Sequence, residues 1–383
     1  MTWQTIELPT GLLEVREDPH NTRSLASLCH FGARNNPKRG FLFVSTVLGK
    51  HLPTQPARML DVHQQLAGRI EATQGAPTLF IGMAETGIGF SYGVFDAWKH
   101  AHPNDEALFI HSTRYPLDGL PLVNFEESHC HAPNQYLHLP EQRDLLQRAQ
   151  TLVMLDDEVS TGKTFNSLWH ALRTHCPNVE RIAIVTLTDF MDDNAHATLD
   201  QNLALPTQHI HAARAQWRFI PKAWQAPPSQ PSTSVQPPTA RTPNAHLGRA
   251  GISQPITLPE SLLEQIQQLL HAHPADALIR IIGTGEFMHA PYLVALHLEQ
   301  QGRRVTYQSS TRSPILEFGP IQHTQLLLDP YGLGDPYFIY NAAAHAPTEN
   351  SVTFILHETA PNPAISDIAQ RLGAHPLVWP MPT

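Results

Sequence analysis

Cysteine is scarce in this sequence, with three residues in 383: Cys29, Cys130 and Cys176. They are scattered, and no two of them form a Cys-x-x-Cys pair. Disulfide-stabilised small domains and thiolate zinc sites need several closely spaced cysteines, so both classes are excluded. This usage is typical of a protein in a reducing compartment, and we expect a cytoplasmic location.

Long apolar runs and an excess of basic residues are also missing. No hydrophobic run approaches the ~18 residues of a membrane-spanning helix. The opening MTWQTIELPTGLLEVREDPH has acidic residues early and lacks the apolar stretch of a signal peptide. The 25 Lys and Arg against 34 Asp and Glu give a net charge of −9, which argues against binding nucleic acid by phosphate neutralisation. We therefore expect neither a membrane nor a nucleic acid as partner.

What the sequence does contain is enough apolar residues for two ordinary domains: 41% are hydrophobic and 15% charged. Residues 226–255 read APPSQPSTSVQPPTARTPNAHLGRAGISQP, a stretch too poor in apolar side chains to form a core. We predict a domain at 1–225, a linker at 226–256 and a second domain at 257–383. The alternative is a long surface loop within one domain, although unstructured loops beyond ~15 residues are uncommon.

Strands alternate with helices on both sides of this linker. Apolar runs that look like buried parallel strands lie at 77–82, 106–111, 152–155, 181–187, 278–282, 304–308, 325–328 and 351–356. Helical patterns lie between them at 92–100, 164–175, 258–271 and 290–301. Alternation of this kind predicts βαβ units, so the expected fold class is α/β.

One pattern occurs twice along the chain. LFIGMAETGIGFSYGVF and IRIIGTGEFMHAPYLVAL each read as strand, glycine turn and helix, and a second strand and the tripeptide Ser-Thr-Arg follow each of them. The distance from Gly82 to Thr113 is 31 residues, and that from Gly283 to Thr311 is 28. Either the second domain is a degenerate duplicate of the first, or two βαβ units look alike by chance.

The segment TLVMLDDEVSTGKTFNSLWHAL, residues 151–172, carries the clearest chemistry. Asp156 and Asp157 follow a buried strand, at the carboxyl end where α/β sheets bind ligands. The Ser/Thr/Gly loop after them presents N–H groups and hydroxyls at a helix N-terminus, which suits a phosphate. A ribose diol together with Mg²⁺ fits both features. Asp156 and Asp157 are therefore the candidate catalytic residues and Mg²⁺ ligands, either directly or through water.

Two other interpretations of this segment were weighed. Its Gly-Lys-Thr resembles the end of a P-loop, but that motif requires glycine at the position of Asp157, where a carboxylate would face phosphate oxygens. The second is an ordinary capped helix with spare acids, which would leave two adjacent carboxylates without a purpose in packing.

The motif LVMLDDEVSTGKT resembles the phosphoribosyl-diphosphate signature of type I phosphoribosyltransferases. The C-terminal QSSTRSPI, with GTGEFMHAPYL before it and LLDPYGLGDPYFIYN after it, is similar to the TRSP domain, named for the four residues found here at 311–314. Together they resemble the two-domain phosphoribosyltransferase–TRSP proteins associated with bacterial tellurite-resistance and stress gene clusters. NPKRGFLFVSTVLGKHLP and FEESHCHAPNQYLH are also similar to that family, so the resemblance covers nearly the whole chain apart from the linker.

The resemblance implies a type I phosphoribosyltransferase-like parallel-sheet domain followed by a second α/β (TRSP) domain. It also implies Mg²⁺-dependent transfer of phosphoribosyl from 5-phosphoribosyl 1-diphosphate (PRPP) to a nitrogenous base or base-like small molecule, or the reverse cleavage, in the synthesis of a nucleotide-like metabolite. A homodimer fits this reading. The alternatives are a catalytically silent regulator that binds PRPP or a nucleotide, and an RNA-associated module.

Binding residues follow from the resemblance position by position. The acid pair would meet the ribose hydroxyls. Residues expected to bind the rest of PRPP share a place on the phosphate loop, on the pyrophosphate loop or beside them: Glu158, Val159, Ser160, Thr161, Gly162, Lys163, Thr164, Ala84, Glu85, Thr86, Gly87, Arg114 and Lys50. Glu85 departs from the commoner pattern, because it would repel pyrophosphate unless Mg²⁺ or another cation intervenes. The mobile basic loop that closes over pyrophosphate would lie at 114–138 and carry His129 and His131.

The second domain lacks an Asp-Asp pair, so we expect it to bind a ligand without being a second catalyst. Its candidate ligand site consists of polar residues at strand ends and turns: Thr284, Gly285, Glu286, Thr311, Arg312 and Asp329. Arg312 would hold an anionic part of the acceptor or product. The alternative is that Arg312 pairs with an acid such as Glu286 for structure alone.

Overall fold

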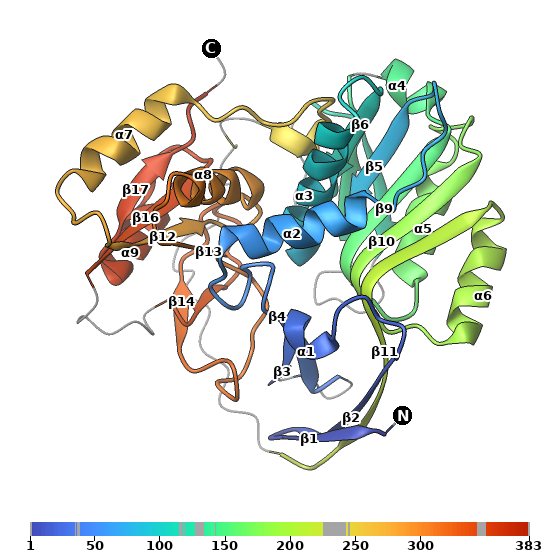
Figure 1. Cartoon of the computed structure of the whole chain (residues 1–383), viewed down its shortest axis with the longest axis horizontal. Coiled ribbons are helices and arrows are strands. Elements are labelled where there is room, and N and C mark those ends of the chain that lie inside the picture. Colours follow the sequence, from blue (N-terminus) through green and yellow to red (C-terminus); the bar gives the residue numbers. More distant parts are fainter. Residues whose placement is uncertain are drawn as a thin grey trace.

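A seven-stranded sheet organises the first part of the chain (Figure 1). The computed structural model describes residues 2–34, 36, 39–114, 117, 119–126, 134–141, 143–224, 243, 246–342 and 350–381. Five strands of the sheet run parallel, and the two N-terminal strands extend it antiparallel along the second half of the long strand β11. In spatial order the strands are β1 (Gln4–Leu8), β2 (Gly11–Glu17), β11 (Thr207–Pro221), β10 (Arg181–Asp189), β9 (Thr151–Val159), β5 (Thr78–Gly82) and β6 (Ala107–His111).

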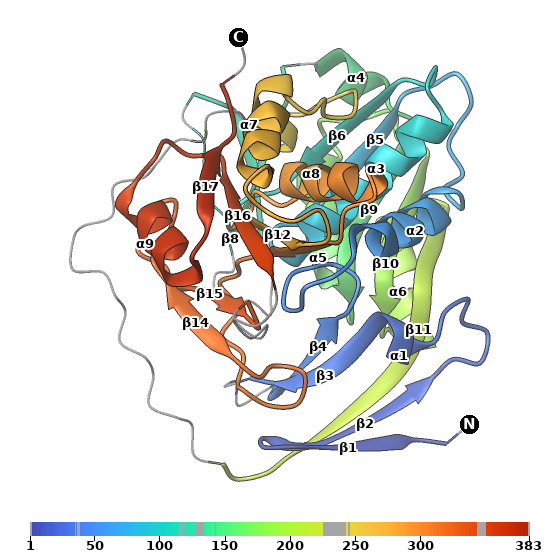
Figure 2. The ribbon, with the colours of Figure 1, turned by 60° about the vertical axis from the view of Figure 1, so that its left-hand side comes forward.

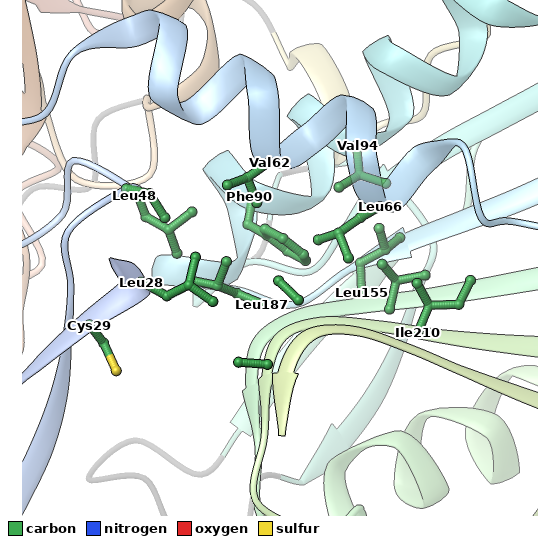
Figure 3. Packing of buried hydrophobic residues seen from close by; sticks show 14 of the residues in the cluster. Leu28, Cys29, Leu48, Val62, Leu66, Phe90, Val94, Leu155, Leu187 and Ile210 are labelled. Carbon is green, nitrogen blue, oxygen red and sulfur yellow. The ribbon is translucent and has the colours of Figure 1, made fainter. Parts of the chain in front are cut away.

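Helices cover both faces of the parallel strands because successive strand residues point to opposite faces. On β9, Val153 and Leu155 join the core under helices α2 (Pro56–Ala67) and α3 (Thr86–Ala101). Their neighbours Leu152 and Met154 join the core under α4 (Arg143–Arg148), α5 (Lys163–Leu172) and α6 (Asp193–Leu203). Figure 3 shows the first of these cores, with side chains of α2 and α3 packed over Leu155 and its neighbours on the sheet.

Small elements lie beside this sheet. Helix α1 (Leu25–Leu28) leads into a hairpin of β3 (Cys29–Ala33) and β4 (Phe41–Ser45), and a second hairpin, β7 (Leu122–Glu126) and β8 (Asn134–His138), follows β6. We call the first hairpin, together with Arg39 and Gly40 before β4, the hood.

A second, smaller parallel sheet organises the C-terminal part (Figure 2). Its order is β13 (Val305–Ser309), β12 (Leu278–Gly283), β16 (Ser351–His357) and β17 (His375–Val378). Helices α7 (Glu260–Leu270), α8 (His289–Gln300) and α9 (Pro363–Leu372) pack with it, and a hairpin of β14 (Thr324–Leu327) and β15 (Tyr337–Tyr340) follows β13.

The two sheets repeat one plan. The first runs α2–β5–α3–β6, hairpin, β9–α5–β10, and the second runs α7–β12–α8–β13, hairpin, β16–α9–β17, with equivalent strands in the same spatial order. Even single hydrogen bonds correspond: Gly82 O accepts the N–H of Ser112 at 2.9 Å, and Gly283 O accepts the N–H of Ser310 at 3.0 Å. This correspondence supports duplication over chance similarity.

The two halves exchange short extended segments. Thr54, just before α2, forms two backbone hydrogen bonds with Tyr307 of β13, at 3.0 and 2.8 Å. Ile252, before α7, forms two with Phe109 of β6, at 2.9 and 2.8 Å. Each half therefore adds a strand-like segment to the edge of the other half's sheet.

The linker expected at 226–256 is shorter than its composition suggested. Its C-terminal residues include the 3₁₀ turn η1 (Leu247–Arg249), and the Arg249 side chain is 1% exposed. Two contacts hold these residues in place. Ile252 pairs with Phe109 of β6, and Arg249 pairs with the buried acids Glu286 and Glu358; amino-acid composition does not reveal either contact. The rest of the predicted linker lies outside the described residues, apart from Pro243.

The fold class predicted from the sequence is confirmed, as are all eight expected strands and four expected helices. The prediction was wrong in one orientation: the strand expected at 325–328 pairs antiparallel in a hairpin instead of joining the parallel sheet. Within the described part of the chain, no helix has the length and apolar character needed to cross a membrane.

Candidate functional site

The acid pair lies where β9 ends, beside the turn that follows β5. Leu155 O accepts the N–H of Met83 at 2.9 Å, which fixes the two strand ends together. A Cβ placed on Gly87, in the first turn of α3, would lie 2.6 Å from Asp156 Oδ1, so that carboxylate rests directly against the helix. Asp156 Oδ1 also accepts the N–H of Asp157 at 2.9 Å. The structure thus brings together the acid pair and the turn expected to hold pyrophosphate.

The expected phosphate loop, residues 158–164, leads into the N-terminus of α5. Gly162 has φ of +69°, in the left-handed region, and a Cβ there would lie 2.6 Å from a methyl group of Leu199. Glycine is therefore required at this position. Because Gly162 is also the N-cap residue, it has no side chain to occupy the first N–H groups of the ten-residue helix. The loop is suited to an anion, since those N–H groups and the helix dipole attract negative charge.

Glu85 occupies the centre of the turn between β5 and α3. It has φ of 67° and ψ of −126°, a conformation that costs a residue with a side chain roughly 1–3 kcal/mol. Its Oε1 accepts hydrogen bonds from Arg312 Nε at 3.0 Å and Nη2 at 2.5 Å, and it forms an ion pair with Arg114 Nε at 3.5 Å. Burial alone would raise the pKa of Glu85, but Arg312, Lys50 and Arg114 together hold it below its ordinary value. Protein side chains therefore supply cations beside Glu85, one of the two possibilities that the sequence left open.

Lys50, in the loop after β4, is 1% exposed and points toward the second half of the chain. Its Nζ donates to Gly285 O at 3.2 Å and lies 3.5 Å from Met288 Sδ, both neutral groups. Burial lowers the pKa of Lys50 to about 8, against the opposing effect of Glu85 and Glu286. A buried ammonium group thus lies near the turn expected to bind pyrophosphate.

Arg114 lies at the end of β6 and is buried, not part of an open loop as expected. Its backbone N–H donates to Glu286 Oε1 at 2.9 Å, and Thr113 Oγ1 donates to Glu286 Oε2 at 2.7 Å. The first half therefore binds the glutamate of the second half's turn, while Arg312 of the second half binds Glu85. His129 and His131, expected on the same basic loop, lie outside the described residues.

The residues expected to form a separate TRSP ligand site have several structural partners. Gly285 N–H donates to Ser310 Oγ at 2.8 Å, Thr284 Oγ1 lies 3.5 Å from Leu356 O, and Thr311 pairs through its backbone with Phe338. Asp329 accepts three backbone N–H groups of the turn that follows it.

Arg312 pairs with acids, as the alternative interpretation expected, but with acids other than the suggested Glu286. Besides Glu85, it donates from Nη1 to Asp335 Oδ2 at 2.6 Å. Glu286 instead receives Arg249 Nε at 3.2 Å, in addition to its bonds from Thr113 and Arg114. Arg312 therefore belongs to the boundary between the two halves.

Sequence reasoning missed a buried ionic network in the second half. Arg249 donates through Nη1 and Nη2 to Glu358 at 2.8 and 2.7 Å, and Tyr331 OH donates to Glu358 at 2.6 Å. Sheet register places Leu155 opposite Gly82 and Leu356 opposite Gly283, so Glu358 stands where Asp157 stands in the first half. Arg249 takes the place of Lys50: both follow a Leu-Gly pair, and a Cβ on Gly49 would meet the ring of Tyr307 on β13 as one on Gly248 would meet that of Phe109, its equivalent on β6. In the sequence, Arg249 is one of two arginines in a Pro-rich stretch, and nothing local marks it as a partner of buried acids.

The hood also contributes residues that the sequence analysis did not single out. Arg39 forms an ion pair with Glu158 and lies over the ring of Phe41, 5.0 Å from its centroid. Phe43 stacks on Phe190 with ring centroids 3.9 Å apart, and Phe190 N–H donates to Val159 O at 2.8 Å. Aromatic side chains of the hood therefore lie beside the phosphate loop.

A parallel α/β sheet that brings an acid pair, a glycine-capped helix N-terminus and a turn surrounded by cations to one edge is typical of proteins that bind a phosphorylated sugar or nucleotide. The family model described as phosphoribosyl transferase matches residues 28–216, and that of the TRSP domain found C-terminal to it matches residues 246–372. The chain belongs to the two-domain phosphoribosyltransferase family with a C-terminal TRSP domain. It is thus a phosphoribosyltransferase.

Solved structures similar to the chain include several phosphoribosyltransferases. An adenine phosphoribosyltransferase from Giardia lamblia, complexed with 9-deazaadenine, is 14% identical with a TM-score of 0.35, over 50% of this chain and 98% of that one. One from Trypanosoma brucei is 10% identical with a TM-score of 0.35, over 55% and 87%. A hypoxanthine phosphoribosyltransferase from Staphylococcus aureus is 15% identical with a TM-score of 0.23, over 38% and 69%. These scores are too low to carry a conclusion about substrate. No curated protein matches the chain.

Proposed function

We propose that the chain transfers the phosphoribosyl group of PRPP to a nitrogenous base or base-like acceptor, or catalyses the reverse cleavage, with Mg²⁺. The observation that carries the proposal is the position of Asp156 and Asp157 between the phosphate loop of α5 and the turn at Glu85. A ribose held by the acid pair would have its 5′-phosphate toward α5 and its 1-diphosphate toward α3. The family match supports the class of reaction. A role in making a nucleotide-like metabolite is part of the same proposal.

The reaction places specific demands on these residues. As pyrophosphate leaves C1 of the ribose, positive charge develops on the ring and negative charge on the leaving group. Asp156 and Asp157 would fix the ribose hydroxyls and stabilise the positive ring, and nearby cations would stabilise the leaving diphosphate. Catalysis would then consist of positioning and charge stabilisation, with no covalent intermediate on the protein.

The donor set around the acid pair fits Mg²⁺ that arrives with its substrate. Mg²⁺ is commonly held by one or two carboxylates together with substrate phosphates and water. Asp156 and Asp157 are half-buried at the strand end and supply such carboxylates. In the described part of the chain, no group of three or more His, Cys, Asp or Glu side chains is placed to hold a metal alone. Bound Mg²⁺ would neutralise charge on the diphosphate.

We place the acceptor between the acid pair and the hood. The stacked rings of Phe43 and Phe190 lie beside the phosphate loop, and Arg39 is tied to Glu158 at the end of β9. Both rings are almost fully buried, so they support the wall of the site, and the partly exposed guanidinium of Arg39 is the planar group on which a base would stack.

Calorimetry with PRPP, with and without EDTA, tests the proposal. The variant Asp156→Asn plus Asp157→Asn should lower PRPP affinity at least about tenfold, because it removes charged hydrogen bonds to the ribose and the Mg²⁺ ligands. Asp61→Asn plus Asp144→Asn removes two exposed carboxylates elsewhere and serves as the matched control. Unchanged PRPP affinity in the first variant would contradict the site. Release of pyrophosphate with candidate bases then separates an enzyme from a silent binding protein.

A further inference from the structure

At the boundary between the two halves, two arginines bind the same carboxylate. Glu85 receives two hydrogen bonds from Arg312 and an ion pair from Arg114. Arg312 comes from the TRSP half, 227 residues further along the chain. Its side chain is 15% exposed and that of Glu85 is 26% exposed, so a small anion in solvent can reach both. The cluster lies at the N-terminus of the sixteen-residue helix α3, on the side of the acid pair.

The corresponding cations of the two halves bind different groups. In the TRSP half, Arg249 is bound at both Nη atoms to Glu358 and at Nε to Glu286. In the first half Lys50 stands at the corresponding position, and it donates to Gly285 O and lies near Met288 Sδ. The Arg249 guanidinium thus binds the carboxylates of the TRSP half, whereas the corresponding Lys50 ammonium of the first half contacts neutral groups.

We propose that Arg312 of the TRSP half is a diphosphate-binding residue of the transferase site, and that Glu85 is an internal carboxylate which the diphosphate displaces from it. This inference rests on the proposed function for the identity of the ligand, a diphosphate group. The planar guanidinium of Arg312 now holds one carboxylate oxygen with two N–H groups, and the same fork fits two oxygens of a phosphate. Arg114 and Lys50 remain beside Glu85 to balance its charge after displacement.

The arrangement explains why a glutamate can stand in a turn that faces a diphosphate. Without a ligand, three desolvated cations close together would repel one another, and Glu85 compensates them. With a ligand, the diphosphate provides more negative charge than Glu85 does, and its oxygens can reach the N–H groups at the start of α3. The transferase site is then completed across the boundary between the halves.

Titration of the full-length protein with inorganic pyrophosphate tests the proposal. Arg312→Gln should weaken pyrophosphate binding about tenfold or more. The affinity of Arg312→Lys should lie between those of Arg312→Gln and the wild type, because lysine keeps the charge but loses the two-pronged guanidinium geometry. Glu85→Gln should tighten binding about tenfold, because no internal carboxylate competes. A misfolded protein would not bind more tightly, so this gain is independent of any folding defect. Arg371→Gln, an exposed arginine of α9 paired with Asp367, is the matched control.

The double variant Glu85→Gln plus Arg312→Gln decides how Arg312 acts. If Arg312 binds the diphosphate, the double variant should bind pyrophosphate at least about tenfold more weakly than Glu85→Gln alone. Equal affinity of the two variants would overturn the proposal, because Arg312 would then act only by neutralising Glu85. Unchanged affinity in Arg312→Gln, or no gain in Glu85→Gln, would overturn it as well.

The same variants titrated with PRPP separate this inference from the proposed function. PRPP binding that depends on Asp156 and Asp157 but ignores Arg312 and Glu85 would overturn the inference and leave the function standing. Pyrophosphate binding that depends on Arg312, in a protein that does not bind PRPP, would overturn the function and support the diphosphate site.

Discussion

Asp156 can approach helix α3 because residue 87 has no side chain. The carboxylate fills the space that a Cβ of Gly87 would occupy, so this contact couples the acid pair to the turn at Glu85. A methyl group at that position would clash with Oδ1 at the end of the Asp156 side chain, while Met83 Cβ would lie 3.3 Å away and the nearest backbone atom, Asp156 Cα, 3.6 Å away. The fold can therefore accept the change, while the carboxylate must move.

Gly87→Ala should separate binding from stability. We expect PRPP affinity to fall about tenfold, because Asp156 is displaced from the ribose, while the free energy of unfolding changes by less than about 1 kcal/mol. Calorimetry and urea denaturation measure the two effects. Gly68→Ala is the control, since its Cβ would lie 3.4 Å from Gln64 O, an ordinary contact. A large loss of stability with normal PRPP affinity would contradict this role of Gly87.

Lys50 should give the site a pH dependence at mildly alkaline pH. Burial places its pKa near 8, below the ordinary 10.5, so its charge is present at pH 7 and is lost as the pH rises through about 8. The charged groups that affect it most are Glu85, Glu286, Arg312 and Asp157. The depressed pKa also means that burial of the charge lowers stability below pH 8, and that this cost disappears between pH 8 and 10.5.

We expect pyrophosphate affinity to fall by up to tenfold per pH unit above about pH 8. In Lys50→Arg the side chain keeps its charge, so this part of the pH dependence should vanish. Because the titration of pyrophosphate itself is common to both proteins, the ratio of their affinities between pH 7 and 9.5 isolates Lys50. A constant ratio would show that Lys50 is too far from the ligand to affect it.

Among the elements, the short turn η1 has the largest effect for its length. It places Arg249 beside Glu286, in the turn after β12, and beside Glu358, directly after β16. All three side chains are almost fully buried. Removing one partner from such a network leaves charges without solvent or counterion, which is more destabilising than the network is stabilising.

Arg249→Met should therefore lower the free energy of unfolding by about 3–5 kcal/mol. Arg371→Met removes an exposed arginine that pairs with Asp367 four residues away, and it should cost less than about 0.5 kcal/mol. Urea denaturation of both variants at pH 7 makes the comparison. If the two losses are equal, Arg249 does not carry the structural role assigned to it.

Elements whose pattern is continuous along the chain were predictable. The strand before Asp156 and the helix after Gly162 are specified by an apolar run and an amphipathic helix within 22 residues, so both and their order followed from the sequence. Strands β3, β7 and β8 have no such run, and the short run Phe41–Val44 of β4 was not assigned to a strand from the sequence. The orientation of β14 depends on which strand it meets, and nothing within 324–327 specifies that partner.

The same distinction applies to the candidate site. The expected ribose and phosphate positions are contiguous in sequence, whereas the contact of Glu85 with Arg312 joins residues 227 apart. A lone carboxylate at position 85 would repel pyrophosphate, so the sequence predicted Mg²⁺ or another cation beside Glu85 but could not identify a residue that supplies one. Only the packing of the two halves supplies that answer.

At the scale of the whole molecule, the two halves are related as partners of a pseudo-symmetric pair within one chain. Thr54 extends the edge of β13 and Ile252 extends the edge of β6. Between them, His289 Nε2 of α8 lies 2.6 Å from Asp96 Oδ2 of α3, and the ring of His289 stacks on Tyr92 at 4.1 Å. The contacts are reciprocal and buried, so the halves should hold together without a covalent connection.

Limited proteolysis tests this whole-molecule view. Residues 225–245 are rich in Pro, Ser and Thr, and we expect the first cut there, giving two fragments of about 25–27 and 15–18 kDa that add up to the 42.7 kDa of the chain. Because the exchanged segments and buried ion pairs lie outside 225–245, the nicked protein should elute from a sizing column at its original position and separate only in denaturant. It should also retain pyrophosphate affinity within about twofold, since Arg312 would still reach Glu85 from the other fragment. Intact protein analysed beside it is the control. Separation of the fragments in native buffer would mean that the covalent connection holds the halves together. If the fragments do separate, pyrophosphate binding should be lost, because Arg312 lies on one fragment and Glu85 on the other.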